Sequence, residues 1–284
     1  TNNGLGVAGA CPKCRVRCVR LLNDTGMVSL SADVEAFQFA LQTGAAVVSN
    51  SWGFSQAIPV PKALADAINH VHDTARGGRG ALILFASGND DRLLRDDELL
   101  GVRGVIGVGA TNSFDEGTPF TNYGPPVDLV APTGTLTTDV SGPDGDDKGD
   151  YTSNFGGTSS ACPVAAGVAG LLVSAAPERS VGELEQLLVR TARRAPYAQP
   201  DSKGHDFIYG YGIVDPVRAL KAIYEPEVPD AGAEPDAALP PPDPGSAGDA
   251  PGCGCGTACG GRGAFVLLLL LAAGARFRRS ARQP

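Results

Sequence analysis

Two hydrophobic patterns alternate along the first 224 residues. Short apolar runs predict strands at 45–50, 81–86, 104–109 and 127–130, and a mixed segment predicts another at 15–22. Apolar residues at three- and four-residue spacing predict helices at 31–43, 61–75, 158–176 and 180–193. Strands that alternate with helices predict an α/β fold with a mostly parallel sheet and right-handed crossovers. Because the strands are apolar throughout, we expect helices on both faces of the sheet.

Several residues mark the ends of these predicted helices. Ser31 is placed to cap the first helix, and Gly44 ends it. Gly77 and Gly78 close the second helix, while Ser180 with Glu183 forms a capping box for the last.

The composition changes after residue 224. Residues 225–252 contain eight prolines, seven acidic residues and no basic residue, so they predict an extended spacer without a core of its own. Residues 253–284 contain three cysteines, an apolar run at 264–275 and a terminal arginine cluster. This run is shorter than the roughly 20 residues of a membrane-spanning helix. We therefore expect three parts: a folded domain (1–224), a linker (225–252) and a tail (253–284).

The charge balance narrows the class of partner. The formal net charge is −8, although the last 32 residues carry five arginines and no acidic residue. An acidic domain does not favour nucleic acid as a partner. It suits a soluble extracytoplasmic enzyme.

One short segment has the composition of a nucleophile site. Residues 157–163 read Gly-Thr-Ser-Ser-Ala-Cys-Pro and open an apolar helix. A serine at this place is often only a helix cap. Here Gly156 and Gly157 allow a sharp turn that exposes the Ser159 hydroxyl, and Pro163 is expected in the first turn, where a missing N–H costs little. The helix N-terminus would also supply N–H groups to a developing oxyanion.

This segment resembles the nucleophile block of the subtilisin-like serine peptidases, in which Ser159 takes the nucleophile's position. Two earlier blocks are similar to the same family, in its order. Ser51-Trp52-Gly53 follows an apolar strand and resembles the segment that pairs with substrate main chain. Ala86-Ser87-Gly88-Asn89 resembles the oxyanion segment: the Asn89 amide and the Ser159 N–H would be the donors, and the three preceding residues would form a pocket wall. The resemblance implies a three-layer subtilisin-like fold.

The family's catalytic aspartate and histidine blocks are not found. We expect both to precede residue 1, which makes the domain N-terminally incomplete and inactive by itself. None of the three histidines matches the family position: His70 and His72 are expected on the exposed side of a helix, and His205 in a polar loop. An alternative is a non-catalytic surface module built on the peptidase fold. An esterase is disfavoured because no Gly-x-Ser-x-Gly segment occurs.

The remaining cysteine and acidic motifs suggest structural roles. Cys11 and Cys14 predict a local or nearby disulfide. Cys18 is expected to be a buried strand residue, and a disulfide of Cys18 with Cys11 or Cys14 is the open alternative. Cys162 is expected in the core. The acidic insert 139–150 could bind structural calcium, although a solvated loop is the favoured interpretation. No cofactor is required for the chemistry, and no metal ligand is assigned.

The tail resembles the MYXO-CTERM sorting signals, which combine a Gly-Cys box, a hydrophobic stretch and terminal arginines. The resemblance implies export to the cell surface, with membrane contact through residues 253–284; an ordinary short anchor is the alternative. A zinc site is disfavoured because these cysteines lack a nearby fourth ligand. We expect polypeptide substrates and a monomer.

Overall fold

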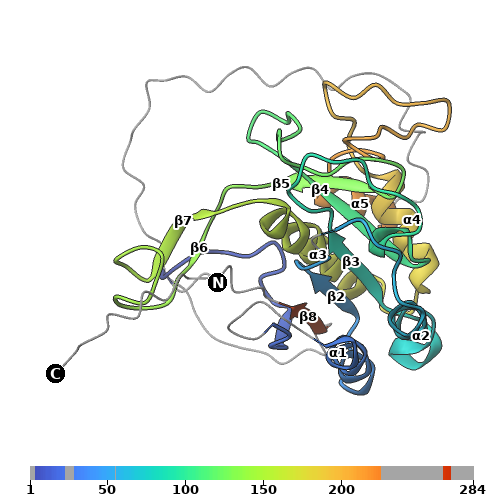
Figure 1. Cartoon of the computed structure of the whole chain (residues 1–284), viewed down its shortest axis with the longest axis horizontal. Coiled ribbons are helices and arrows are strands. Elements are labelled where there is room, and N and C mark those ends of the chain that lie inside the picture. Colours follow the sequence, from blue (N-terminus) through green and yellow to red (C-terminus); the bar gives the residue numbers. More distant parts are fainter. Residues whose placement is uncertain (1–3, 23–28, 55, 225–264, 270–284) are drawn as a thin grey trace.

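The computed structural model describes residues 4–22, 29–54, 56–224 and 265–269. Its main sheet is parallel in every pairing (Figure 1), which confirms the predicted fold class. In spatial order the strands are β1 (Arg15–Cys18), β8 (Phe265–Leu269), β2 (Val47–Asn50), β3 (Leu82–Ala86), β4 (Val105–Thr111) and β5 (Leu129–Pro132).

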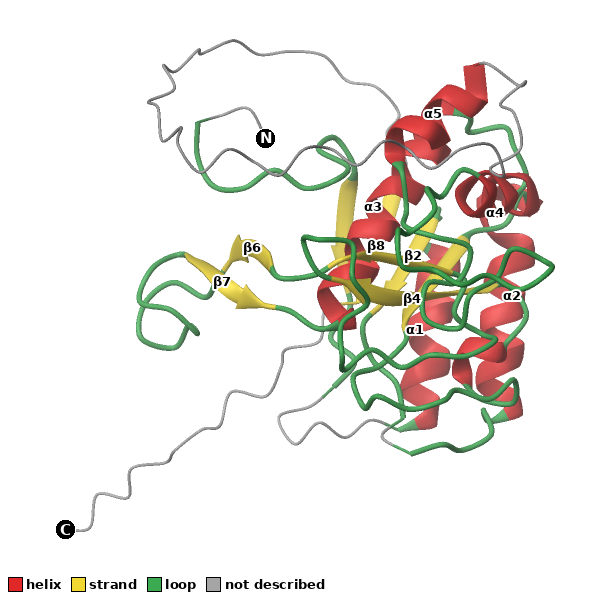
Figure 2. Ribbon diagram, turned by 90° about the horizontal axis from the view of Figure 1, so that it is seen from above, coloured by secondary structure: helices red, strands yellow, loops and turns green. Residues whose placement is uncertain are grey.

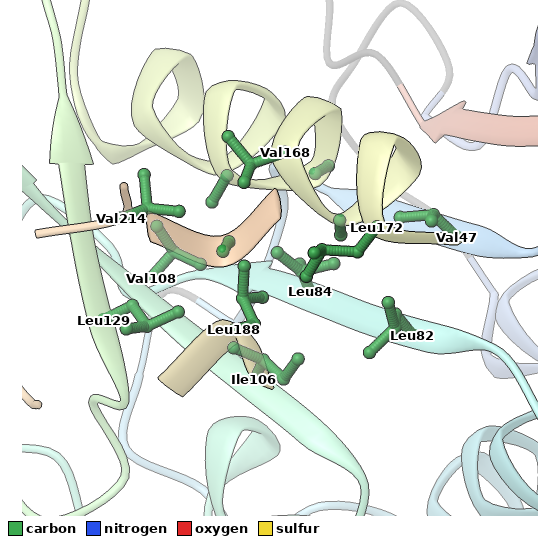
Figure 3. Packing of buried hydrophobic residues seen from close by; sticks show 14 of the residues in the cluster. Val47, Leu82, Leu84, Ile106, Val108, Leu129, Val168, Leu172, Leu188 and Val214 are labelled. Carbon is green, nitrogen blue, oxygen red and sulfur yellow. The ribbon is translucent and has the colours of Figure 1, made fainter. Parts of the chain in front are cut away.

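Helices cover both faces of this sheet. Alternate strand residues point in opposite directions: Leu82 and Leu84 pack with the cluster under one set of helices, and Ile83 packs with the other cluster. One face carries α3 (Thr158–Ala175), α4 (Val181–Arg190) and α5 (Pro216–Tyr224); Figure 3 shows Leu172 of α3 and Leu188 of α4 in this core. The other face carries α1 (Leu30–Gln42) and α2 (Lys62–Gly78). The predicted three layers are thus confirmed.

Helix ends were predicted with mixed accuracy. The capping box of Ser180 and Glu183 is present at α4. The cap of α1 is Ser29 rather than Ser31, because the Ser29 hydroxyl accepts from the Ala32 N–H.

The sequence does not predict three elements of the structure: helix α5, the short helix η1 (Leu99–Gly101), and the hairpin of β6 (Thr135–Thr138) with β7 (Tyr151–Phe155). The acidic insert is the loop of this hairpin, which extends away from the sheet in both views (Figures 1 and 2).

Part of the expected tail lies in the sheet. Residues 265–269 form β8 and pair with both β1 and β2, with Leu268 opposite Cys18 and Ser49. The linker and the rest of the tail lie outside the described residues. Within the described residues, α3 is the one helix long and apolar enough to span a membrane, but 61% of it is buried inside the fold, as a core helix would be.

The cysteines nearest the N-terminus behave differently from one another. Cys11 and Cys14 form the predicted disulfide. Cys18 is exposed, so the prediction of a buried thiol is wrong. It lies on β1, an edge strand whose four residues are all exposed. Cys162 is fully buried, as expected.

The first turns of α3 depend on a side chain from another segment. Pro163 is the sixth residue of this helix, not a first-turn residue as expected. A residue with an N–H at this position would donate to the carbonyl of Ser159, four residues earlier. In its place the Ser51 hydroxyl donates to that carbonyl at 2.9 Å. Ser51 therefore satisfies the group that Pro163 leaves open and ties β2's end to α3.

A buried histidine joins α2 to α4. The His72 ring contacts Asp73 through Nδ1 at 2.7 Å and Glu185 through Nε2 at 2.9 Å, and Asp73 also pairs with Arg103. His72 is 7% exposed, so the prediction of an exposed histidine is wrong for it, whereas His70 is exposed. The ring packs on Gly104, where φ is +78° and a side chain would overlap it.

We predict that Ser51→Ala lowers the free energy of unfolding by about 1–3 kcal/mol, because the Ser159 carbonyl loses its donor. Pro163→Ala should restore a donor to the same carbonyl, so the double variant should be more stable than Ser51→Ala alone. Denaturant unfolding of the four proteins in this cycle checks both statements. Simple additivity of the two substitutions would contradict the assignment.

We also predict that the His72 contacts stabilise the fold most at low pH. The hydrogen bond to Glu185 raises the pKa of His72, burial opposes this, and the contact with Asp73 adds to it. A raised pKa in the folded state gives stability that is fully present below about pH 6.5 and is lost as the pH rises through the folded-state pKa. Unfolding of His72→Gln at pH 5.5 and 8.5 should show a larger loss of stability at pH 5.5. His70→Gln is the matched control, and an equal loss at both pH values would contradict the prediction.

Candidate active site

The eight candidate residues lie around one pocket of about 270 Å³. It is formed where β2 and β3 end and where α3 begins. The eight come from three segments far apart in the sequence, and they are Ser51, Trp52, Gly53, Ala86, Ser87, Gly88, Asn89 and Ser159. The structure thus brings together every residue that the three motifs singled out.

Ser159 is the second residue of α3 and is half-buried at the pocket. Backbone N–H groups in the first turn of a helix have no partner within the helix, so that of Ser159 is open to an acceptor. Its hydroxyl has no hydrogen-bond partner among the residues that the structure describes. The side chain and the N–H are therefore both free to act on a bound group.

The amide of Asn89 has a defined orientation. Its Oδ1 accepts from the Thr158 N–H at 2.8 Å and from the Thr158 hydroxyl at 3.0 Å. That hydroxyl accepts in turn from the Gly88 N–H at 3.1 Å. Because Oδ1 is occupied, Nδ2 is the end of the amide left to donate, and no described residue accepts from it. The donor predicted for an oxyanion is therefore held in place by the residue before Ser159.

Gly157 allows the Asn89 amide to lie close to the start of α3. Its φ is +73°, and an added Cβ would lie 3.1 Å from Oδ1 and 3.2 Å from Nδ2 of Asn89. A side chain would be strained there by its backbone and would crowd the amide.

Asn122 supports the other side of the pocket and was missed by the sequence analysis. It is buried; its Nδ2 donates to the Ser87 carbonyl at 2.9 Å, and its Oδ1 accepts from the N–H groups of Asp90 and Arg92. Gly88, at φ +101°, leaves room for this amide. Asn122 belongs to a polar loop, and no motif or periodicity in the sequence marks it.

The Ser-Trp-Gly segment is fixed by contacts of its own. The Ser51 hydroxyl is committed to the Ser159 carbonyl, which leaves the backbone of this segment as the part that could meet a peptide. Trp52 packs edge-on against Phe85 with ring centroids 5.2 Å apart, and its Nε1 donates to Asn50. The pocket wall is therefore anchored in the core.

No histidine base lies beside Ser159 in the described part of the chain. Among the described residues, which include all three histidines, no histidine lines the pocket. His205 contacts the Val127 carbonyl at 2.8 Å instead. Cys162 is no alternative nucleophile, because burial raises the pKa of its thiol to about 11.

The acidic insert does not fit calcium in the form described. The two carboxylate oxygens of Asp139 accept from the N–H groups of Val140 and Asp147. Across the described part of the chain, no group of three or more potential metal ligands comes together. The Asp139 carboxylate is thus used by the loop's own backbone, and we derive no step through a metal.

Together, these residues provide two of the elements that an acyl transfer needs: a nucleophile and hydrogen-bond donors for the oxyanion. A carbonyl carbon placed against the Ser159 hydroxyl would have its oxygen near two candidate donors, Asn89 Nδ2 and the Ser159 N–H. Donors held in advance stabilise a developing negative charge without reorganising. Among the described residues, no histidine is placed to remove the serine proton.

The chain is similar in sequence to known proteases. The chain is 31% identical over 255 residues to the calcium-dependent protease of Nostoc sp., covering 78% of this chain and 38% of that protein. It is 33% identical over 218 residues to the halolysin-like extracellular serine protease Nep of Natrialba magadii, covering 76% and 35%. The chain therefore spans well under half the length of these relatives.

Solved structures of proteases superpose on this fold. A protease structure from Pseudoalteromonas arctica PAMC 21717 superposes with a TM-score of 0.63 at 28% identity, covering 78% of this chain and 66% of that one. A lanthipeptide protease at 22% identity, with a TM-score of 0.56, shares the fold.

The model of the Subtilase family matches residues 1–212, which include all three segments of the pocket. The chain belongs to the subtilase family.

Proposed function

We propose that this chain forms the substrate-binding and nucleophile-bearing part of a serine endopeptidase. Ser159 attacks the carbonyl carbon of a peptide bond, and Asn89 Nδ2 with the Ser159 N–H binds the oxyanion. The observation that carries the proposal is the pair of hydrogen bonds from Thr158 to Asn89 Oδ1, at 2.8 and 3.0 Å. They turn the amide so that a donor remains free beside the serine.

The histidine and aspartate of the triad come, in this proposal, from a segment outside the printed sequence. Three observations support this: all three histidines are described, none lines the pocket, and Ser159 Oγ has no described partner. A serine hydroxyl is a weak nucleophile without a base. We therefore expect the 284-residue chain alone to be inactive and the longer native protein to be active.

We further propose that the native protein is exported. The relative from Natrialba magadii is named an extracellular protease, and the disulfide of Cys11 and Cys14 suits an oxidising compartment. The sorting signal in residues 253–284 would then deliver the enzyme to the cell surface, with polypeptides as substrates and the monomer as the working unit. The Nostoc relative is named a calcium-dependent protease, which supports structural calcium in the native protein at a site that we do not assign.

The second candidate is a non-catalytic surface module. The same lack of a pocket histidine favours it. The preserved orientation of Asn89 counts against it, since a binding module has no need of a free amide donor beside an unpartnered serine.

We predict that a fluorophosphonate probe labels Ser159 in the native full-length protein and not in the isolated 284-residue chain. The probe reacts only with a serine activated by a base. Peptide mapping by mass spectrometry identifies the labelled residue, and Ser159→Ala and Ser160→Ala are the matched controls. Absence of labelling in the full-length protein would support the non-catalytic module instead.

We predict that Asn89→Ala in the full-length protein lowers kcat by about 10²–10³-fold with little change in KM, because one oxyanion donor is lost. Thr158→Val should lower kcat less, since the Thr158 N–H still holds Oδ1. Steady-state kinetics on a peptide substrate checks both. An unchanged kcat for Asn89→Ala would show that this amide does not bind the oxyanion.

A further inference from the structure

Three hydroxyl groups beside the start of α3 make contacts that the catalytic proposal does not use. Ser160 follows Ser159 and is 1% exposed, so its hydroxyl depends on protein partners. It contacts the Thr133 hydroxyl at 3.0 Å and the Thr135 hydroxyl at 3.2 Å. Thr133 lies between β5 and β6, and its N–H donates to the Thr111 carbonyl at the end of β4. Thr135 is the first residue of β6, so these contacts join the base of the β6–β7 hairpin to α3.

Donor counting fixes the direction of each hydrogen bond in this group. A hydroxyl has one hydrogen to donate, and a carbonyl can only accept. Thr133 donates to the Gly157 carbonyl at 2.8 Å, so it accepts from Ser160. Ser160 has then used its hydrogen and accepts from Thr135. The hydrogens therefore all point one way, from the hairpin toward Gly157. We call Thr135, Ser160 and Thr133 the hydroxyl relay.

The peptide group between Gly157 and Thr158 continues this direction to Asn89. In a trans peptide the C=O and the N–H point in opposite directions. The C=O accepts from Thr133 at 2.8 Å, and the N–H donates to Asn89 Oδ1 at 2.8 Å. The same C=O also accepts the Ser160 N–H at 3.1 Å, at the start of α3. Because the peptide plane is held at both ends, the hydroxyl relay helps to set the direction of the N–H that orients Asn89.

Hydrogen bonds that are aligned head to tail strengthen one another. A carbonyl that accepts a hydrogen bond becomes more polar, which makes the donor at the other end of the same group stronger. Peptide and carboxamide groups both transmit this effect, because their C=O and C–N bonds share one conjugated system. The last donor in the series is Asn89 Nδ2, the group proposed above to bind the oxyanion. The hydroxyl relay therefore makes this group a better donor to a developing negative charge.

We propose that the three residues of the hydroxyl relay are positioning residues of the oxyanion site, because they orient and polarise the Asn89 amide. The inference rests on the proposed function, which makes Asn89 an oxyanion donor. The base of the β6–β7 hairpin thereby affects the rate of the reaction without touching the substrate.

Three substitutions in the full-length protein separate this role from simple packing. Thr133→Val keeps the size of the side chain and removes its donor, whereas Thr133→Ser keeps the hydroxyl. Thr137→Val is the matched control on β6. Thr137 is also half-buried, and its hydroxyl has no hydrogen-bond partner among the residues that the structure describes.

We expect Thr133→Val to lower kcat about three- to tenfold with little change in KM, because the lost hydrogen bonds act through an oxyanion donor. Thr133→Ser should restore most of this loss, and Thr137→Val should keep the parent kcat. In an Asn89→Ala background, Thr133→Val should lower kcat no further, since the amide that the hydroxyl relay polarises is gone.

Ser160→Ala is the second variant, and it decides the matter if Thr133→Val does not fold. It breaks the hydroxyl relay one bond earlier and leaves the Thr133 hydroxyl free to hold the Gly157 carbonyl. Its kcat should therefore fall by less than that of Thr133→Val, and again only while Asn89 is present.

A spectroscopic readout does not require catalysis. In full-length protein with asparagine isotopically labelled in the side-chain amide, the resonance of Asn89 Nδ2 is identified by its loss in Asn89→Ala. Loss of polarisation should move this resonance to lower frequency in Thr133→Val, whereas Thr137→Val should leave it in place.

Three results would overturn the inference: an unchanged kcat in a folded Thr133→Val, the same fold-loss of kcat with and without Asn89, or an Asn89 resonance that moves no more in Thr133→Val than in Thr137→Val. Phosphonate labelling judges the proposed function separately. Labelling with an unchanged kcat in Thr133→Val would overturn only the positioning role. A moved resonance in a protein that is never labelled would overturn the catalysis but not the action of the hydroxyl relay on Asn89.

Discussion

The site depends on one short contact between the loop after β3 and the first residue of α3, in which Thr158 donates twice to the Asn89 carbonyl oxygen. Thr158 is fully buried, and its hydroxyl also holds the Gly88 N–H, so the end of β3 and the start of α3 cannot shift independently. Gly157 makes the contact sterically possible. The rest of the pocket is supported from this point, since the neighbouring Ser159 carbonyl is itself held by Ser51.

The parallel sheet explains why residues so far apart in sequence meet here. Parallel strands present their carboxyl ends at one edge, and β2 and β3 are neighbours with Asn50 opposite Phe85. The segments that follow them, Ser51-Trp52-Gly53 and Ser87-Gly88-Asn89, therefore emerge side by side. Helix α3 packs across β2, β3 and β4 and brings its N-terminus to the same edge. Burial of α3 in the core thus sets the position of Ser159.

Much of this could be predicted from the sequence, because the strands are apolar runs and the three motifs are local. The supporting contacts could not. Ser51 donates to the carbonyl that Pro163 leaves without an N–H donor, a relation visible only once the helix start is known. Asn122 lies in a loop without periodicity. The exposure of His72 is predicted wrongly because helical spacing shows which residues share a helix face but not which neighbour covers that face. Here Glu185 of α4 contacts the His72 ring.

The central claim is that Asn89 is oriented by Thr158 so that Nδ2 faces the group bound to Ser159. A crystal structure of the full-length protein with a peptide boronic acid tests it most directly, since boron forms a tetrahedral adduct with an activated serine. We predict a bond from Ser159 Oγ to boron, one boronate oxygen within hydrogen-bond distance of Asn89 Nδ2 and of the Ser159 N–H, and Oδ1 still bonded to Thr158. An adduct whose oxygens point away from Asn89, or an Asn89 amide turned away from Thr158, would contradict the account.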